Sequence, residues 1–240
     1  MKKLGLIGGM SWESTAVYYR LLNEMARERL GGHHSAELVL ASVDFAPIAA
    51  MQAAGEWAQA TAVMVEAARR LQAAGATALL ICANTMHRMA NEVQAAADIP
   101  LIHIADVTAT AIREAGVRRP LLLATRFTME QAFYRDRLAA AGVEAAIPPL
   151  AARERLHGII YDELVRGRIE PASRAALIAI VERAAQEDGV DSAILGCTEF
   201  DLLVRPDDLP VPTFDTTEIH ARAAMDFALD QRASAGTPKA

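Results

Sequence analysis

Cys197 is the side chain with the clearest capacity for chemistry in this chain of 240 residues. It follows a short apolar run, residues 193–195, and precedes Thr198 and Glu199, where a helix is predicted to start. Such a run is typical of a buried parallel strand, and ligands bind just beyond the carboxyl ends of these strands. Unpaired N–H groups at a helix start lower the pKa of a thiol. Cys197 is therefore a candidate nucleophile, acid/base or metal ligand, with a buried inert cysteine as the alternative.

A second apolar run, residues 79–82, ends in a similar polar cluster, but its cysteine comes one position earlier. Asn84 and Thr85 follow, and their side chains and backbone N–H groups could hold a carboxylate; ordinary helix capping is the alternative. Side chains alternate across a strand, so Cys82 and Ala83 are expected to point to opposite faces. We therefore expect Cys82 to point into packing, unless the strand ends in a bulge.

Strands that alternate with helices must position these two strand ends. Strands are predicted at residues 3–7, 37–43, 77–82, 100–104, 119–124, 143–147, 192–196 and 211–214, and one continuous helix is predicted over residues 152–166. The alternation argues for parallel sheets, and the pattern restarts near residue 99. We predict an α/β fold of two pseudo-symmetric parallel-sheet domains with the active site in the cleft between them. The expected domains are 1–98 with 209–240, and 99–208, so that the last helix returns to the first half.

The composition argues against several classes of function. Hydrophobic residues make up 52% of the chain and charged residues 22%, which suffices for a sizeable core. The net charge of −6 gives no basic surface for nucleic acid or an anionic membrane. The apolar runs are too short to span a bilayer. Two cysteines in such a chain indicate thiols rather than a disulfide. We expect a cytoplasmic protein with no nucleic-acid or membrane partner.

Two further motifs carry less information. Gly8 and Gly9 follow the first predicted strand, but their spacing does not match the dinucleotide-binding fingerprint. His33 and His34 are adjacent in a predicted turn, but no other group of ligands has a spacing that suits a metal. We therefore predict neither a nucleotide site nor a metal site.

Five segments, in order along nearly the whole chain, carry a resemblance to a known family. They are Gly5-Leu6-Ile7-Gly8-Gly9-Met10-Ser11-Trp12-Glu13-Ser14-Thr15, Val43-Asp44-Phe45, Asn84-Thr85-Met86-His87, Thr125-Arg126-Phe127-Thr128-Met129-Glu130-Gln131 and Gly196-Cys197-Thr198-Glu199. Together they resemble the aspartate/glutamate racemase family, which acts on acidic amino acids without a cofactor. The resemblance is strongest to the enterobacterial-type amino-acid racemase branch.

The resemblance implies two pseudo-symmetric α/β domains with the substrate between them. It implies two cysteines on opposite faces of the substrate Cα, one removing the α-proton and the other returning a proton. It implies no pyridoxal phosphate and no metal, so the carbanion must be stabilised by hydrogen bonds and preorganised dipoles. The implied partner is an amino-acid substrate, and a homodimer is compatible with the resemblance because relatives are often dimers.

This sequence departs from the family pattern at the first cysteine position, which is occupied by Ala83. Alanine has no proton to give, although the branch often has threonine there. Three outcomes follow. Another group, such as Thr85, His87 or a water, could serve that face of the substrate. The chemistry could instead be that of arylmalonate-type decarboxylases, which keep only the second cysteine. Alternatively, the protein could bind an acidic amino acid without turnover.

The resemblance also assigns the substrate site. Cys197 is implied as the catalytic acid/base, with Ala83 opposite it. Contacts to carboxylate or ammonium groups are expected from Met10, Ser11, Gln52, Asn84, Thr85, Thr125 and Thr198. Glu199 would position either the ammonium or the thiol. Val165 stands where some relatives have a lysine, which leaves glutamate or a broader range of substrates open beside aspartate.

Overall fold

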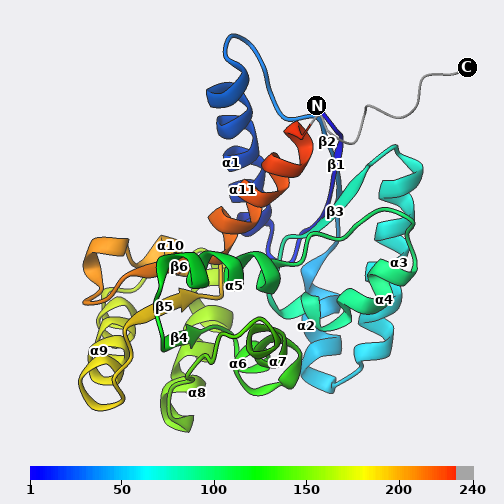
Figure 1. Ribbon diagram of the computed structural model, residues 1–240. Coiled ribbons are helices and arrows are strands. Elements are labelled where there is room, and N and C mark those ends of the chain that lie inside the picture. The colour runs from blue at the N-terminus through cyan, green and yellow to red at the C-terminus, as the bar shows by residue number, and fades with distance from the viewer. Residues whose placement is uncertain (231–240) are drawn as a thin grey trace, which may run out of the picture.

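Two parallel sheets form the framework of the molecule in the computed structural model, which describes residues 1–230 (Figure 1). The first sheet has the order β2-β1-β3 and the second the order β4-β5-β6. The strands are β1 (Leu4–Gly8), β2 (Leu38–Ser42), β3 (Ala78–Ile81), β4 (Pro120–Leu123), β5 (Ser192–Leu195) and β6 (Thr213–Asp215). All the pairings are parallel, so the predicted α/β fold of two parallel-sheet halves is confirmed.

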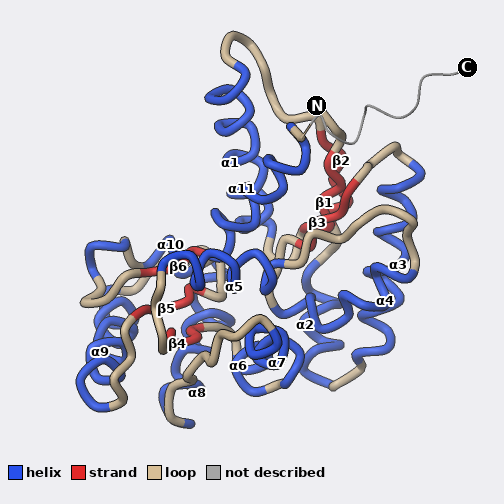
Figure 2. Tube along the Cα trace, in the orientation of Figure 1, coloured by secondary structure: helices blue, strands red, loops and turns tan. Residues whose placement is uncertain are grey.

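Helices flank the sheets and connect their strands (Figure 2). The α-helices are α1 (Trp12–Leu30), α2 (Phe45–Ala54), α3 (Trp57–Ala73), α4 (Ala90–Ala95), α5 (Ile104–Ala115), α6 (Arg126–Glu130), α7 (Ala132–Ala140), α8 (Leu150–Gly158), α9 (Pro171–Glu187), α10 (Phe200–Leu203) and α11 (Thr216–Leu229). Three short 3-10 segments are η1 (Thr85–Met89), η3 (Leu164–Arg166) and η4 (Pro206–Asp208), and η2 (Ile159–Glu163) is π-helical.

Hydroxyl side chains cap the helices that follow the first strand of each sheet in the sequence. Ser11 Oγ accepts a hydrogen bond from the Ser14 N–H at the start of α1, at 3.4 Å. Thr125 Oγ1 accepts from the Thr128 N–H at the start of α6, also at 3.4 Å. Serine and threonine are favoured caps because their oxygens satisfy N–H groups that lack a helical partner. Both caps follow a strand at its carboxyl end, where a ligand site is expected in a parallel sheet.

Each sheet has one further pairing beyond its three strands. Leu101 forms an isolated bridge with Leu79, and Ala146 forms one with Leu121. The strands predicted over residues 100–104 and 143–147 are therefore reduced to single bridges. In the first case His103 already caps α5, through its ring nitrogen and the Ala105 N–H, which leaves no length for a strand.

The strand pairing also moves two segments across the domain boundaries that the sequence suggested. β6 pairs with β5 in the second sheet, although residues 209–240 were expected in the first domain. Leu101 extends the first sheet, although residues 99–208 were expected in the second domain. The physical reason is that a short apolar run shows that a strand is buried, but not which sheet edge it joins.

Helices α5 and α11 cross between the halves. α5 follows the first sheet in the sequence but buries Ile104, Ala109 and Ile112 in the core of the second half. α11 follows the second sheet but buries Ala221, Ala224 and Met225 against side chains of β1, β3 and α1. The two helices also lie against each other (Figure 1). Each half is therefore completed by a helix that comes from the other.

The helix predicted over residues 152–166 is broken into α8, η2 and η3. Ile159, Ile160 and Leu164 are all buried in the core of the second half. A π-helical turn brings residues five apart above one another, so Ile159 and Leu164 can face the same core. The π segment also carries Tyr161, and isolated π turns in other proteins are frequent at functional sites.

Candidate active site

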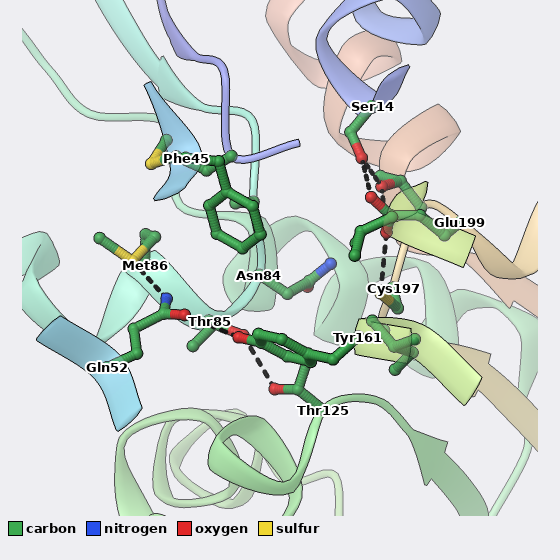
Figure 3. Close-up of a pocket in the computed structure, with 16 residues that line it drawn as sticks. Ser14, Phe45, Gln52, Asn84, Thr85, Met86, Thr125, Tyr161, Cys197 and Glu199 are labelled. Atoms are coloured by element: carbon green, nitrogen blue, oxygen red, sulfur yellow. Dashed lines mark hydrogen bonds between the residues drawn. The ribbon is translucent and has the colours of Figure 1, made fainter. Parts of the chain in front are cut away.

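A pocket lies between the two halves, at the carboxyl ends of strands from both sheets (Figure 3). It contains about 430 Å³ of unfilled space, part of it open to solvent. Segments that follow β1, β3, β4 and β5 contribute to its wall, together with α2, η2 and η3. The lining residues are Met10, Ser14, Phe45, Gln52, Ala83, Asn84, Thr85, Met86, Thr125, Ile160, Tyr161, Val165, Gly196, Cys197, Thr198 and Glu199.

Glu199 is the centre of a hydrogen-bond network at one end of the pocket. Its side chain is only 4% exposed. Oε1 accepts from Ser11 Oγ and, at 2.7 Å, from Ser14 Oγ. Oε2 accepts from Cys197 Sγ at 2.9 Å and from Thr198 Oγ1 at 3.0 Å. Four donors thus converge on one carboxyl group.

Cys197 lies in contact with this carboxylate. Burial raises the pKa of its thiol well above the ordinary value, and the charge of Glu199 and the hydrogen bond to it raise that pKa further. The expectation that a helix start would lower the thiol pKa is therefore wrong. The physical reason is that the following helix, α10, is a single turn, and a buried anion lies nearer than any helix dipole. The raised pKa keeps Cys197 in its thiol form at neutral pH.

The orientation of the Asn84 carboxamide follows from its partners. Thr216 Oγ1 donates its hydrogen to the Leu195 carbonyl at 2.9 Å, so it can only accept from Asn84. Asn84 therefore presents Nδ2 to Thr216, at 3.0 Å. Its Oδ1 atom is buried without a hydrogen-bond partner among the described residues. A buried unpaired acceptor in a pocket wall suits a ligand donor such as an ammonium group.

Each half of the fold contributes a cluster of hydroxyl groups to the site, and the two clusters occupy corresponding positions. Thr85 Oγ1 lies 2.9 Å from Thr125 Oγ1 and 3.1 Å from Thr128 Oγ1. On the other side the cap hydroxyls Ser11 and Ser14 bond Glu199 in the same manner. Thr85 stands four residues after the end of β3, and Glu199 stands four residues after the end of β5. The scaffold is thus paired, but one side carries a carboxylate and the other a neutral hydroxyl.

The outer wall of the pocket is built from α2, η1 and the π turn. Tyr161 donates its hydroxyl hydrogen to Gln52 Oε1 at 2.6 Å, and Gln52 Nε2 donates to Met86 Sδ at 3.1 Å. The ring of Phe45 lies 6.2 Å from that of Tyr161. Figure 3 shows Phe45, Gln52 and Met86 on the side of the pocket away from Glu199 and Cys197. This end is neutral and largely apolar.

Ala83 and Cys82 are adjacent in the chain but have different surroundings. Ala83 lines the pocket, whereas Cys82 is fully buried in the core of the first half with Leu6 and Leu80. Burial raises the pKa of the Cys82 thiol far above its ordinary value. The prediction that Cys82 points into packing is confirmed, because adjacent residues at the strand end face opposite ways.

His87 has a structural setting. Its Nδ1 bonds the Ala83 carbonyl oxygen at 3.0 Å, and its Nε2 accepts from the Ile104 N–H at 3.3 Å. Burial, followed by the proximity of His103 and His220, keeps the pKa of His87 well below its usual range. Both ring nitrogens are thus engaged by the backbone, and His87 is not among the pocket-lining residues.

Most of the predicted site residues meet in this pocket. Those that line it are Met10, Gln52, Ala83, Asn84, Thr85, Thr125, Cys197, Thr198 and Glu199. Ser11 does not line it but holds Glu199 through a hydrogen bond. Gly9 makes this placement possible: its φ is +94°, and a Cβ there would collide with the Val43 carbonyl oxygen.

Sequence reasoning missed several lining residues, namely Ser14, Phe45, Met86, Ile160, Tyr161 and Gly196. Ser14 could have been found, because the third residue after an N-cap lies beside the cap. Tyr161 could not, because an α-helical reading of its segment gives it a different direction from the π turn.

Known proteins resemble this chain both in sequence and in structure. The family model described as Asp/Glu/Hydantoin racemase matches residues 7–224. The chain belongs to this family. A proposed Asp/Glu racemase from Yersinia pestis is 48% identical, with a TM-score of 0.88 over 96% of this chain and 100% of that one. An aspartate racemase homologue from Pyrococcus horikoshii OT3 is 34% identical, with a TM-score of 0.83 over the same shares.

More distant structures share the fold of this racemase family member. Glutamate racemase from Francisella tularensis, solved with D-glutamate, is 15% identical, with a TM-score of 0.68 over 100% of this chain and 84% of that one. Family membership therefore agrees with the resemblance predicted from the sequence motifs. Among residues 1–230 no helix is long and apolar enough to cross a membrane. No three His, Cys, Asp or Glu side chains gather there as a metal-ligand set.

Proposed function

We propose that this racemase family member transfers protons at the Cα atom of an amino acid without a cofactor, with Cys197 as the acid/base. The observation that supports this most strongly is the buried pair formed by the Cys197 thiol and the Glu199 carboxylate, joined at 2.9 Å inside the pocket between the halves. Such a pair can exchange one proton without a change in its net charge. The use of no pyridoxal phosphate is inferred from the family.

The polar end of the pocket suits the ammonium group of an amino acid. Asn84 Oδ1 is an unpaired acceptor, and the Glu199 carboxylate supplies a negative charge. The hydroxyl groups of Thr85 and Thr125 are neutral donors within the same pocket and suit the α-carboxylate. Such donors also stabilise the charge that develops on that carboxylate when the α-proton leaves.

The proton balance of the proposed step is simple. In one direction the thiol proton of Cys197 passes to Glu199 Oε2, and the thiolate then takes the α-proton of the substrate. In the other direction the thiol returns a proton to the carbanion, and the proton on Glu199 returns to the sulfur. The α-hydrogen is exchanged when a proton from water replaces the one on the sulfur before it returns to the carbanion, and nothing else is consumed.

The opposite face of the substrate lies against Ala83, which cannot give or take a proton. His87 cannot replace it, because both of its ring nitrogens bond the backbone. We therefore propose exchange at one face, with inversion slow or absent. Thr85 or a water is the remaining route to the second face. The substrates suggested by the relatives are aspartate and glutamate, and their amides extend the series to be tested.

The test is deuterium exchange at Cα, followed by NMR in deuterated water for both enantiomers of aspartate, glutamate, asparagine and glutamine. Exchange with retained configuration is the expected result, and Cys197→Ala should abolish it. Cys82→Ala is the matched control and should keep the exchange, because Cys82 lies outside the pocket. If no member of the series exchanges its α-proton, the proposal fails.

A second candidate is favoured by the same single thiol. Cys197 is protonated at rest, and Ala83 on the opposite side has no group that transfers a proton. A single thiol of this kind is suited to deliver a proton to an enediolate formed by loss of CO2, as in arylmalonate-type decarboxylases. Release of CO2 from a panel of disubstituted malonates, absent in Cys197→Ala, would support this reading. Binding of amino acids with neither exchange nor CO2 release would indicate a protein that binds without turnover.

A further inference from the structure

The charge of the pocket bears on which amino acids it can hold. Of the 16 residues that line it, all within the described part of the chain, Glu199 alone has a carboxylate, and none is lysine, arginine or histidine. Outside the lining, Arg126 is exposed and places its guanidinium carbon 5.6 Å from the centre of the Phe127 ring. The pocket wall is therefore anionic.

A substrate's net charge decides how it interacts with such a wall. An amino acid with an uncharged side chain is a neutral zwitterion, whose ammonium group can lie near Glu199. Aspartate or glutamate adds a second carboxylate and meets Glu199 with a net negative charge. Charges repel more strongly in a buried site than in water, and moving a carboxylate out of water without a nearby cation is unfavourable. The chain as a whole, at −6, does not attract anions either.

The outer end of the pocket shows what the side chain would meet. Phe45 and Met86 present apolar surface there. Gln52 is 3% exposed, and its Nε2 donates only to Met86 Sδ, which is a weak acceptor. A carbonyl oxygen of a ligand would be a better partner for that amide. Gln52 and Tyr161 are neutral, however, and neutral donors offset the desolvation of a full charge only in part.

We infer that the pocket selects amino acids with uncharged side chains, such as glutamine and asparagine, over the acidic amino acids. This inference rests on the proposed function for the identity of the site, but it concerns binding as well as turnover. Glutamine against glutamate and asparagine against aspartate are the decisive pairs, because the members of each pair have nearly the same shape and differ in charge.

Two measurements on the full chain separate the inference from the proposed function. Cα deuterium exchange should be at least tenfold faster for glutamine than for glutamate. Titration calorimetry should give a dissociation constant for glutamine at least tenfold lower. Tighter binding of glutamine without exchange would support the selectivity and overturn the proposed catalysis. Equal or tighter binding of glutamate would overturn the selectivity, even where exchange occurs. Binding of neither at millimolar concentration would overturn both.

Val165 allows a test by gain of charge, because it lines the pocket and is only partly buried. Val165→Lys should lower the ratio of glutamine to glutamate binding at least tenfold. Val165→Met is the control of similar length without charge, and it should keep the preference for glutamine. A ratio that is the same in the two variants would show that charge does not set the selectivity.

Discussion

At the scale of single residues, the site depends on two pairs of residues, each pair two positions apart in the sequence. Cys197 and Glu199 form the thiol–carboxylate pair, whereas Ala83 and Thr85 occupy the corresponding positions in the other half. The sequence predicted Cys197 and most of the lining residues. It did not predict that Glu199 would raise the thiol pKa, because the sign of that effect depends on burial and on the direction of a side chain across the pocket.

Glu199→Gln tests this electrostatic relation. Burial would still raise the pKa of Cys197, but the negative charge would be gone, so we expect the thiol pKa to fall. The measurement is the pH dependence of iodoacetamide labelling, with Cys82→Ala in both proteins so that Cys197 is the only thiol. An unchanged or higher midpoint would contradict the role assigned to the carboxylate.

Ala83→Cys tests the proposal that the Ala83 side of the pocket lacks a group that transfers a proton. A thiol at this position would face the substrate from the side opposite Cys197, so the variant is expected to invert configuration as well as exchange the α-hydrogen. Polarimetry or chiral chromatography of the best exchanging substrate measures the inversion. Ala83→Ser is the control of similar size, and it should invert more slowly. A variant that exchanges but never inverts would argue against the geometry proposed for the two faces.

At the scale of elements, the strand ends and the helices that follow them hold the site together. The alternation of strands and helices was readable from the sequence because buried runs and helical periodicity are local signals. The sequence did not show which strand β6 pairs with, nor that Leu101 forms a single bridge, because both depend on which sheet edge is free. The π turn around Tyr161 was also hidden, since it results from the burial of Ile159 and Leu164 against the core.

Thr216 at the start of α11 is the link between these elements, because it joins Asn84 of the first half to the Leu195 carbonyl of β5. Thr216→Val removes the hydroxyl and leaves both partners buried and unpaired. We expect the free energy of unfolding to fall by about 1–3 kcal/mol and the exchange rate to fall with it. Urea denaturation and the exchange assay measure the two effects.

Thr216→Ser is the matched control, because it keeps the oxygen and loses a methyl group. It should retain most of the exchange rate. Equal losses in the serine and valine variants would mean that packing, not the hydrogen bonds, is what the threonine supplies.

At the scale of the whole molecule, three buried histidines lie where the halves meet. The ring centre of His87 lies 4.6 Å from that of His103 and 5.7 Å from that of His220. Burial, assisted by Arg137, lowers the pKa of His103 to about 4, and burial lowers that of His220 to about 4. The unfolded chain therefore binds more protons than the folded chain between the ordinary histidine pKa and these values.

The fold should accordingly lose stability as the pH falls from about 6.5 towards 4, with the full contribution present above about 6.5. At pH 5 the loss is roughly 2 kcal/mol for each of His103 and His220. Urea midpoints at pH 7.5 and 5 measure it. His220→Phe should be less stable at pH 7.5, because Tyr18 and the Ile102 carbonyl lose their partner, but should show a smaller drop at pH 5. A drop equal to that of the unmodified chain would contradict this account.

The crossing of α5 and α11 has a consequence for the order in which the protein is made. Met225 and Ala224 complete the core around β1, which is synthesised well before α11. Until α11 leaves the ribosome, α1 covers that face of the first sheet only in part, so the first half cannot finish folding during synthesis as an early, independent unit. A protein truncated before residue 216 would expose part of that face, and neither half would be expected to persist as a separate fragment.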